Sequence, residues 1–158
     1  MKKGFTMIEL IFVIVILGIL ASVAIPRLAA TREDAEISAA VANLRTLVSD
    51  ASAYYTAKGS LKSSGDADAK WSEITNVPLG SAASTNATTD ANLKIGGVDD
   101  CIKVKLENGT PAKIKFTKKD NATGTCGEVL KSDPLQPYFN ATDGIPIGSS
   151  TSVYTTKQ

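Results

Sequence analysis

Residues 5–28 read FTMIELIFVIVILGILASVAIPRL, and this stretch organises the rest of the chain. Between Leu10 and Ile25 it shows no polar face, which is typical of a helix that is surrounded by apolar material on all sides. About 24 residues of helix would reach roughly 36 Å, which is enough to cross a hydrocarbon core of about 30 Å with some tilt. We therefore predict a membrane-spanning helix over residues 5–28.

One acidic residue, Glu9, lies inside this apolar run. A carboxylate at membrane depth is costly unless it has a partner, so it indicates a functional site. The nearest cation that the chain can offer is an amine at the start of the same segment. If the chain were cut between Gly4 and Phe5, the new N-terminal ammonium would lie about one helical turn before Glu9. The two charges would then neutralise each other.

The sequence KGFTMIEL, followed by a long apolar run and a proline, resembles the class III signal of type IV prepilins and related pseudopilins. The resemblance covers roughly the first third of the chain. It implies that residues 1–4 are a leader and that a prepilin peptidase cuts after Gly4 and methylates Phe5. It also implies that Glu9 pairs with the N-terminus of a neighbouring subunit during assembly, and that Pro26 kinks the N-terminal helix.

The resemblance further implies partners and a location. Such chains form homo-oligomeric helical filaments together with other pilins, and they depend on a membrane platform protein and a separate assembly ATPase. Before assembly the chain would cross the bacterial inner membrane once, with its C-terminus outside; afterwards it would belong to a periplasmic or cell-surface filament. Lys2 and Lys3 agree with a cytoplasmic N-terminus, although Arg27 and Arg32 weaken this charge argument.

Two other interpretations of the N-terminus remain open. A basic start followed by an apolar run is also typical of a secretory signal, with a small-residue cleavage site at residues 22–24. The charged Glu9, the length of the apolar run and the unexplained Gly4 argue against it. A plain single-pass anchor that is never cleaved is the second alternative.

Residues 29–57 are predicted to continue the same helix as an amphipathic segment. Apolar side chains recur there at helical spacing, and Gly59 marks the end of the segment. Because no turn cluster separates the two segments, we expect one helix of about 53 residues that would reach roughly 80 Å. A sheet is needed to cover its apolar stripe. The stripe consists of Ile37, Val41, Leu44, Val48, Ala51 and Tyr55, and it is widened by Ala40, Leu47 and Tyr54.

Residues 58–100 are predicted to be a connecting region. They are poor in large apolar side chains and rich in Ser, Thr, Ala, Gly, Asn and Asp. Within them, residues 70–74 (KWSEI) are expected to form a short helix. Asp66 and Asp68 lack the glycine and glutamate that would complete a calcium-binding hand loop, so we predict no metal site.

Residues 101–158 are predicted to hold the sheet and the C-terminal region. From Cys101 apolar and polar residues alternate, residues 108–109 (Asn-Gly) offer a tight turn, and the alternation resumes as far as Phe116. This pattern predicts a β-hairpin with one apolar face, and a third strand is expected near residues 127–130. The resulting fold is α+β, with a long N-terminal helix packed on a small antiparallel sheet as in type IV pilins.

The two cysteines, Cys101 and Cys126, are expected to form a disulfide, since an even pair in an exported chain favours one. Closing a loop of about 25 residues would stabilise the fold by roughly 3.5 kcal/mol on the chain-entropy model. Two buried free thiols are the alternative.

The outward face of the hairpin carries Lys103, Lys105, Lys113 and Lys115. A basic surface of this kind attracts DNA phosphates or the acidic groups of a neighbouring subunit. Lysine is also common on solvent-exposed sheet faces and edges, where its charge prevents association with other strands. No arginine or aromatic side chain is interleaved with the four lysines, so DNA is the less favoured partner.

The composition argues against an enzyme. The chain has no histidine, no CxxC pair and no GxxxxGK phosphate loop, so we predict no catalytic residue and no cofactor. With 17 basic and 16 acidic residues the net charge is only +1, so the overall charge of the protein does not attract nucleic acid or anionic surfaces. The preferred function is a structural subunit of a type IV pilus-like filament. The alternatives are a pseudopilin of a type II secretion or DNA-uptake machine and, less favoured, a membrane-anchored binding domain.

Overall fold

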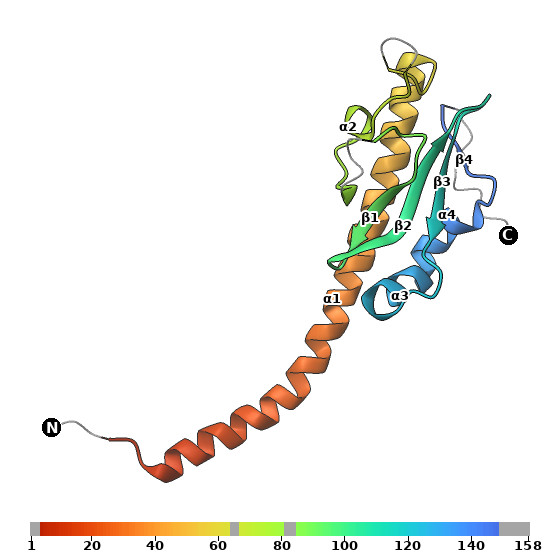
Figure 1. The fold of residues 1–158 in the computed structure, drawn as a ribbon. Helices are drawn as coiled ribbons and strands as arrows, with labels where there is room; N and C mark the ends of the chain where they lie inside the picture. Colours follow the sequence, from red (N-terminus) through yellow and green to blue (C-terminus); the bar gives the residue numbers. More distant parts are fainter. Residues whose placement is uncertain (1–3, 64–66, 81–84, 149–158) are drawn as a thin grey trace. The chain divides into compact units, whose positions relative to one another are not determined.

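A computed structural model describes residues 4–63, 67–80 and 85–148 of the 158-residue chain (Figure 1). The first three residues of the predicted leader, Asp66 and the last ten residues of the tail lie outside the described residues. The chain divides into two compact units, Met1–Ala35 and Glu36–Gln158.

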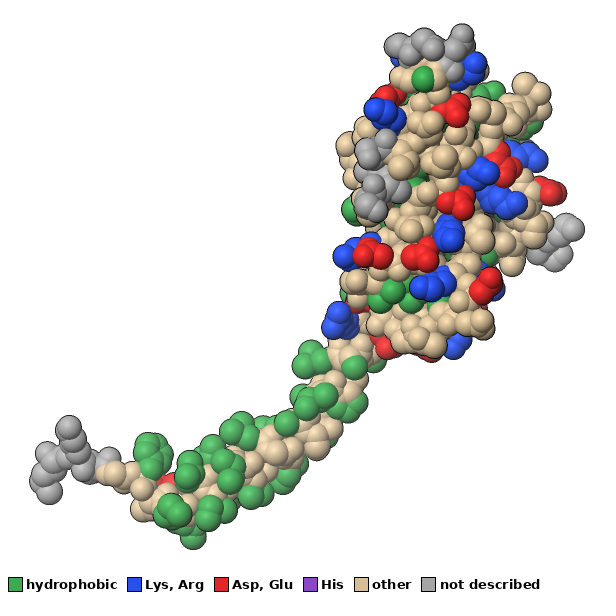
Figure 2. All heavy atoms as spheres, viewed as in Figure 1, with side chains coloured by type: hydrophobic (Ala, Val, Ile, Leu, Met, Phe, Trp, Pro, Cys, Tyr) green, Lys and Arg blue, Asp and Glu red, His purple; other side chains and the backbone are tan. Residues whose placement is uncertain are grey.

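The first unit is helical from Met7 onwards. Helix α1 spans Met7–Lys58, so it begins two residues after the predicted start at Phe5, and it continues from the first unit into the second. The helix runs through Pro26 without interruption, and the predicted kink stays a prediction. Every described residue up to Ala35 is exposed, and Figure 2 shows apolar side chains covering this part of α1. By length and composition α1 is able to cross a membrane.

In the second unit, α1 lies across one face of a sheet (Figure 1). The predicted stripe is confirmed, and its buried part includes Ala40 and Leu47, which were predicted to widen it. Leu44 and Ala51 are fully buried, whereas Ile37, Val41, Val48 and Tyr55 pack only partly against the core. The side chains that α1 buries in the second unit are Ala40, Leu44, Leu47 and Ala51.

The sheet has four antiparallel strands in the order β1-β2-β3-β4. The predicted hairpin is confirmed, because Val104 lies opposite Phe116 and the ladder extends to Glu107 opposite Lys113. Its connection is longer than the expected two-residue turn. Pro111 has no N–H to donate, so the ladder resumes only after it. The strands are β1 (Ala91–Ile95), β2 (Val98–Glu107), β3 (Lys113–Lys118) and β4 (Ile145–Pro146).

Two sequence-based expectations are wrong. Strand β1 lies inside the region 58–100 that was predicted to be a connection, and its alternating Ala91, Leu93 and Ile95 are buried. In place of the third strand expected near residues 127–130, the structure has a helix. Besides this helix, α3, the described part of the second unit has three other short helical elements. The helices are α2 (Trp71–Ile74), α3 (Gly124–Lys131), the 3-10 helix η2 (Asp133–Leu135) and α4 (Gln136–Asn140).

Helix α3 forms instead of a strand because its apolar residues have helical spacing. Cys126, Val129 and Leu130 stand at i, i+3 and i+4 and are all buried. The fourth position of the sheet is then filled by β4, which pairs Ile145 with Ile114. The short helix predicted at residues 70–74 is confirmed as α2.

The connecting region is held to the rest of the second unit by buried and polar contacts. Trp71, the only tryptophan of the chain, is fully buried. The Thr75 hydroxyl donates a hydrogen bond to Asp50 Oδ2 of α1 at 2.6 Å, and within the region the Thr88 hydroxyl donates one to Asp68 Oδ2 at 2.6 Å. The region is therefore part of the folded unit, and the fluorescence of Trp71 can be used to follow its unfolding.

We expect Gly96→Ala to destabilise the second unit by about 1–3 kcal/mol. Gly96 has φ +57° in the turn between β1 and β2, and an added Cβ would collide with the Glu36 carboxylate and lie 3.0 Å from Thr125 Cγ2. Urea unfolding followed by Trp71 fluorescence measures the loss. Gly97→Ala is the matched control, since Gly97 has φ +79° but open space around it. Equal losses in the two variants would show that the contact with Glu36 is irrelevant.

Candidate functional site

The first turn of α1 holds Glu9 in a local hydrogen-bond pattern. Glu9 Oε2 accepts hydrogen bonds from the backbone N–H of Thr6 at 2.9 Å and from the Thr6 hydroxyl at 2.7 Å. In return the Glu9 backbone N–H donates to Thr6 Oγ1 at 3.3 Å. This reciprocal arrangement is a capping box, in which a threonine cap is followed three residues later by a glutamate. The sequence prediction did not include Thr6, although its spacing from Glu9 is the usual signature of this cap.

The capping box brings the Glu9 carboxylate close to the predicted cleavage site. The carboxylate folds back onto the backbone nitrogen of Thr6, which is one residue after Phe5. Gly4 and Phe5 precede the helix in exposed, non-helical backbone, and the Phe5 side chain is 90% exposed. The bond between them is thus accessible to a peptidase. An ammonium formed on Phe5 would lie next to a carboxylate that is already turned towards it.

The surroundings of Glu9 are apolar and uncovered. Met7, Ile8 and Leu10 are all more than half exposed, as are most of the large side chains that follow them. Within the described residues, the two hydrogen bonds that the Glu9 carboxylate accepts both come from Thr6.

The predicted disulfide is confirmed between Cys101 of β2 and Cys126 of α3. Their Cα atoms are 5.8 Å apart, within the range that disulfides span, and both side chains are buried. The bond ties α3 to the sheet and encloses β3 in its loop.

The four predicted surface lysines lie on the β2–β3 ladder, but they do not form a uniformly basic patch. All four are half-buried, and acidic residues are interspersed among them. Lys103 Nζ lies 3.9 Å from Asp100 Oδ1, and Figure 2 shows basic and acidic side chains mixed over the second unit. This mixture disfavours a long polyanion such as DNA, whose affinity depends on many phosphate contacts.

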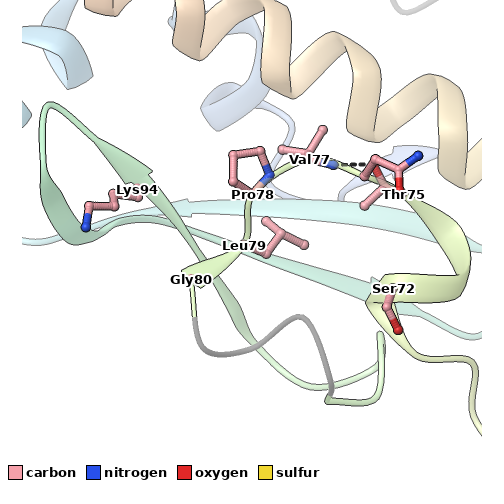
Figure 3. A pocket seen from close by; sticks show the side chains of 8 residues that line it. Ser72, Thr75, Val77, Pro78, Leu79, Gly80 and Lys94 are labelled. Atoms are coloured by element: carbon pink, nitrogen blue, oxygen red, sulfur yellow. Dashed lines mark hydrogen bonds between the residues drawn. The ribbon is translucent and has the colours of Figure 1, made fainter.

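A mainly apolar pocket of about 400 Å³ lies beside α2 (Figure 3). Among the described residues that line it, the charged one is Lys94, whose Nζ lies 3.6 Å from Asp99 Oδ1. Its Thr75 hydroxyl is already engaged with Asp50 and also accepts a hydrogen bond from the Val77 N–H at 3.2 Å. The pocket therefore lacks the convergent reactive groups of an active site. In the described ranges, no group of three or more His, Cys, Asp or Glu residues could hold a metal ion.

Comparison with known proteins agrees with the N-terminal geometry. A family model described as the prokaryotic N-terminal methylation motif matches residues 1–25. A fimbrial protein of Neisseria meningitidis serogroup A is 30% identical over 146 residues, which cover 84% of this chain and 84% of that protein. No solved structure matches the chain significantly.

Proposed function

Because the chain belongs to the type IV pilin family, we propose that it is the subunit of a type IV pilus-like filament that assembles through its N-terminal helix. The family is a structural one and its members are not enzymes. The observation that carries the proposal is the methylation motif followed by an α1 whose first part is apolar and exposed throughout. The residues of this assembly site are Gly4 and Phe5 for cleavage, Phe5 for methylation, and Glu9 for pairing.

The exposed part of α1 supplies the driving force for assembly. A contiguous apolar surface of this size is stable only in lipid or against other apolar surfaces. Packing such helices together buries them at about 25 cal/mol per Å² relative to water. A segment that first crosses the inner membrane can therefore become the core of a fibre outside it.

Glu9 sets the register of the packed helices in this proposal. Cleavage after Gly4 creates an ammonium on Phe5, and Glu9 of one subunit pairs with that ammonium on its neighbour. Inside an apolar core, each of the two charges is costly without the other. Only a stagger of the helices that brings them together is then favourable.

The proposed topology follows from the two ends of the chain. The N-terminus stays on the cytoplasmic side, and the second unit lies outside, where an oxidising compartment accounts for the Cys101–Cys126 bond. A prepilin peptidase and methyltransferase, a membrane platform protein and other pilins are the partners. A separate ATPase supplies the energy, because the sequence contains no GxxxxGK loop.

The alternatives account for the N-terminal features but not for the similarity to a fimbrial protein over most of the chain. A pseudopilin of a type II secretion or DNA-uptake machine would carry the same leader. The similarity to a fimbrial protein extends over 84% of both chains, which favours the pilus subunit. A membrane-anchored binding domain would keep Met1.

Mass spectrometry of the N-terminus tests the processing. In protein from sheared surface filaments of the native host, we expect the chain to begin at Phe5 and to carry one added methyl group. A Gly4→Leu variant is expected to keep Met1 and to stay in the membrane fraction, because the bulky side chain blocks cleavage. A wild-type chain that begins at Met1 or at Ile25 would be an anchor or a secreted domain, and the filament proposal would fail.

A further inference from the structure

The outer face of the β2–β3 ladder contains a small charged hollow of about 200 Å³, and we propose that it binds a single phosphate monoester group or free phosphate. This inference does not rest on the proposed filament role, because it uses only residues of the second unit. We call the hollow the lysine cleft. It is lined by Asp90, Lys103, Lys105, Glu107, Lys115 and Thr117.

Two of the residues that line the lysine cleft, Lys105 and Lys115, carry like charges on neighbouring strands. Lys105 and Lys115 are direct partners in the antiparallel register, and both are half-buried. Like charges directly opposite each other on neighbouring strands are destabilising. Among the described residues neither lysine forms an ion pair, in contrast to Lys103 and Lys119, which both lie 3.9 Å from Asp100. Neither ammonium group is therefore held by an ion pair, although the carboxylates of Asp90 and Glu107 line the same cleft.

The adjacent pair of the ladder adds hydrogen-bond donors. Thr117 is the register partner of Lys103, and both line the same cleft. Lysine ammonium groups bind phosphate as point charges, and a hydroxyl donates a further hydrogen bond. A phosphate monoester carries about −1.5 to −2 charge at neutral pH, so the two lysines that form no ion pair attract it more strongly than they attract a single carboxylate.

The acidic residues and the size of the lysine cleft define the ligand further. Asp90 and Glu107 would repel a second phosphate next to the first, so the site favours an isolated phosphate over a nucleic-acid backbone. Its volume is below the roughly 300–1,000 Å³ that drug-sized ligands occupy. The cleft therefore suits free phosphate or the phosphate of a small carrier such as a sugar, whose hydroxyl groups can donate hydrogen bonds to the two carboxylates.

Amide NMR titration of the full chain in detergent micelles tests the site. Inorganic phosphate, compared with chloride at equal ionic strength, is expected to produce saturable shifts at Lys105, Lys115 and Thr117. The double variant Lys105→Gln/Lys115→Gln is expected to bind phosphate at least about tenfold more weakly, since two charge-assisted contacts are lost. The matched control is Lys94→Gln/Lys131→Gln, which removes two lysines that have acidic neighbours, Asp99 and Glu128.

Urea unfolding provides a second readout that also checks folding. Without phosphate, the Lys105→Gln/Lys115→Gln variant should resist urea as well as the wild type or better, because the repulsion has been removed. Added phosphate should raise the unfolding midpoint of the wild type and of the control, but not that of this variant.

Three titrations decide the outcome. Equal affinity for inorganic phosphate and glucose 6-phosphate would identify free phosphate as the ligand, and tighter binding of the sugar phosphate would identify a sugar phosphate; both support the site. Non-saturating shifts at all exposed lysines would mean an adventitious ion only and would overturn the proposal. Much tighter binding of a DNA oligonucleotide at equal phosphate concentration would mean a polyanion surface, which would overturn it as well.

Discussion

Glu9→Gln is expected to leave leader cleavage intact and to lower incorporation of the chain into filaments beside wild-type subunits by at least about a hundredfold. Glutamine has nearly the same shape, and its amide oxygen can still accept the hydrogen bonds from Thr6 that are seen at 2.7 and 2.9 Å. What it lacks is the negative charge. In the proposed filament core the ammonium of the neighbouring Phe5 would then be buried without a partner.

Co-expression with tagged wild-type subunits measures this loss. The ratio of variant to wild type in sheared filaments is compared with the same ratio in the membrane fraction, and mass spectrometry checks that both chains begin at Phe5. Two controls separate charge from capping. Thr6→Val removes the cap hydroxyl but keeps the Glu9 charge, and Glu33→Gln removes another exposed acid from α1.

Each control has a defined result. We expect both control variants to enter filaments close to the wild-type level. If Thr6→Val reduced incorporation as strongly as Glu9→Gln, the cap rather than the charge would be the assembly determinant. Normal incorporation of Glu9→Gln would remove Glu9 from the proposed site.

Replacing both cysteines, Cys101→Ala/Cys126→Ala, is expected to lower the free energy of unfolding of the second unit by about 3–5 kcal/mol. The two residues are 25 positions apart, and a cross-link over such a loop stabilises by roughly 3.5 kcal/mol on the chain-entropy model. Both side chains are also buried, so their truncation removes core contacts. Because the bond holds α3 against β2, we expect α3 to loosen first.

Urea unfolding monitored by Trp71 fluorescence gives the overall loss, and hydrogen exchange of the α3 amides gives its location. The matched control is the wild type under reducing conditions, which loses the cross-link but retains both sulfur atoms. We expect it to lose most of the same stability. An unchanged unfolding midpoint after complete reduction would contradict a stabilising role of the disulfide.

The sequence by itself determined the elements whose signal is local. The apolar run and the methylation motif identified the N-terminal helix and the family, and the 3.6-residue period identified the amphipathic part of α1. Alternation from Cys101 to Phe116 identified the hairpin, and the pair of cysteines in an exported chain identified the disulfide. Each of these patterns is contained within neighbouring residues or in the composition. The capping box of Thr6 and Glu9 was also readable from spacing, although it was not predicted.

The tertiary structure alone decided the features that depend on partners distant in sequence. Strand β1 has a local signal, the alternating Ala91, Leu93 and Ile95 before Gly96 and Gly97, that the prediction missed, but its place beside β2 follows only from strand pairing. The helical spacing of α3 was already present in the sequence, but only the structure showed that its buried face meets the sheet through Cys126. The opposition of Lys105 and Lys115 follows from the register, which the five-residue connection containing Pro111 sets. Strand pairing and register are interactions across the fold, so a local pattern can indicate a strand without indicating what lies opposite it.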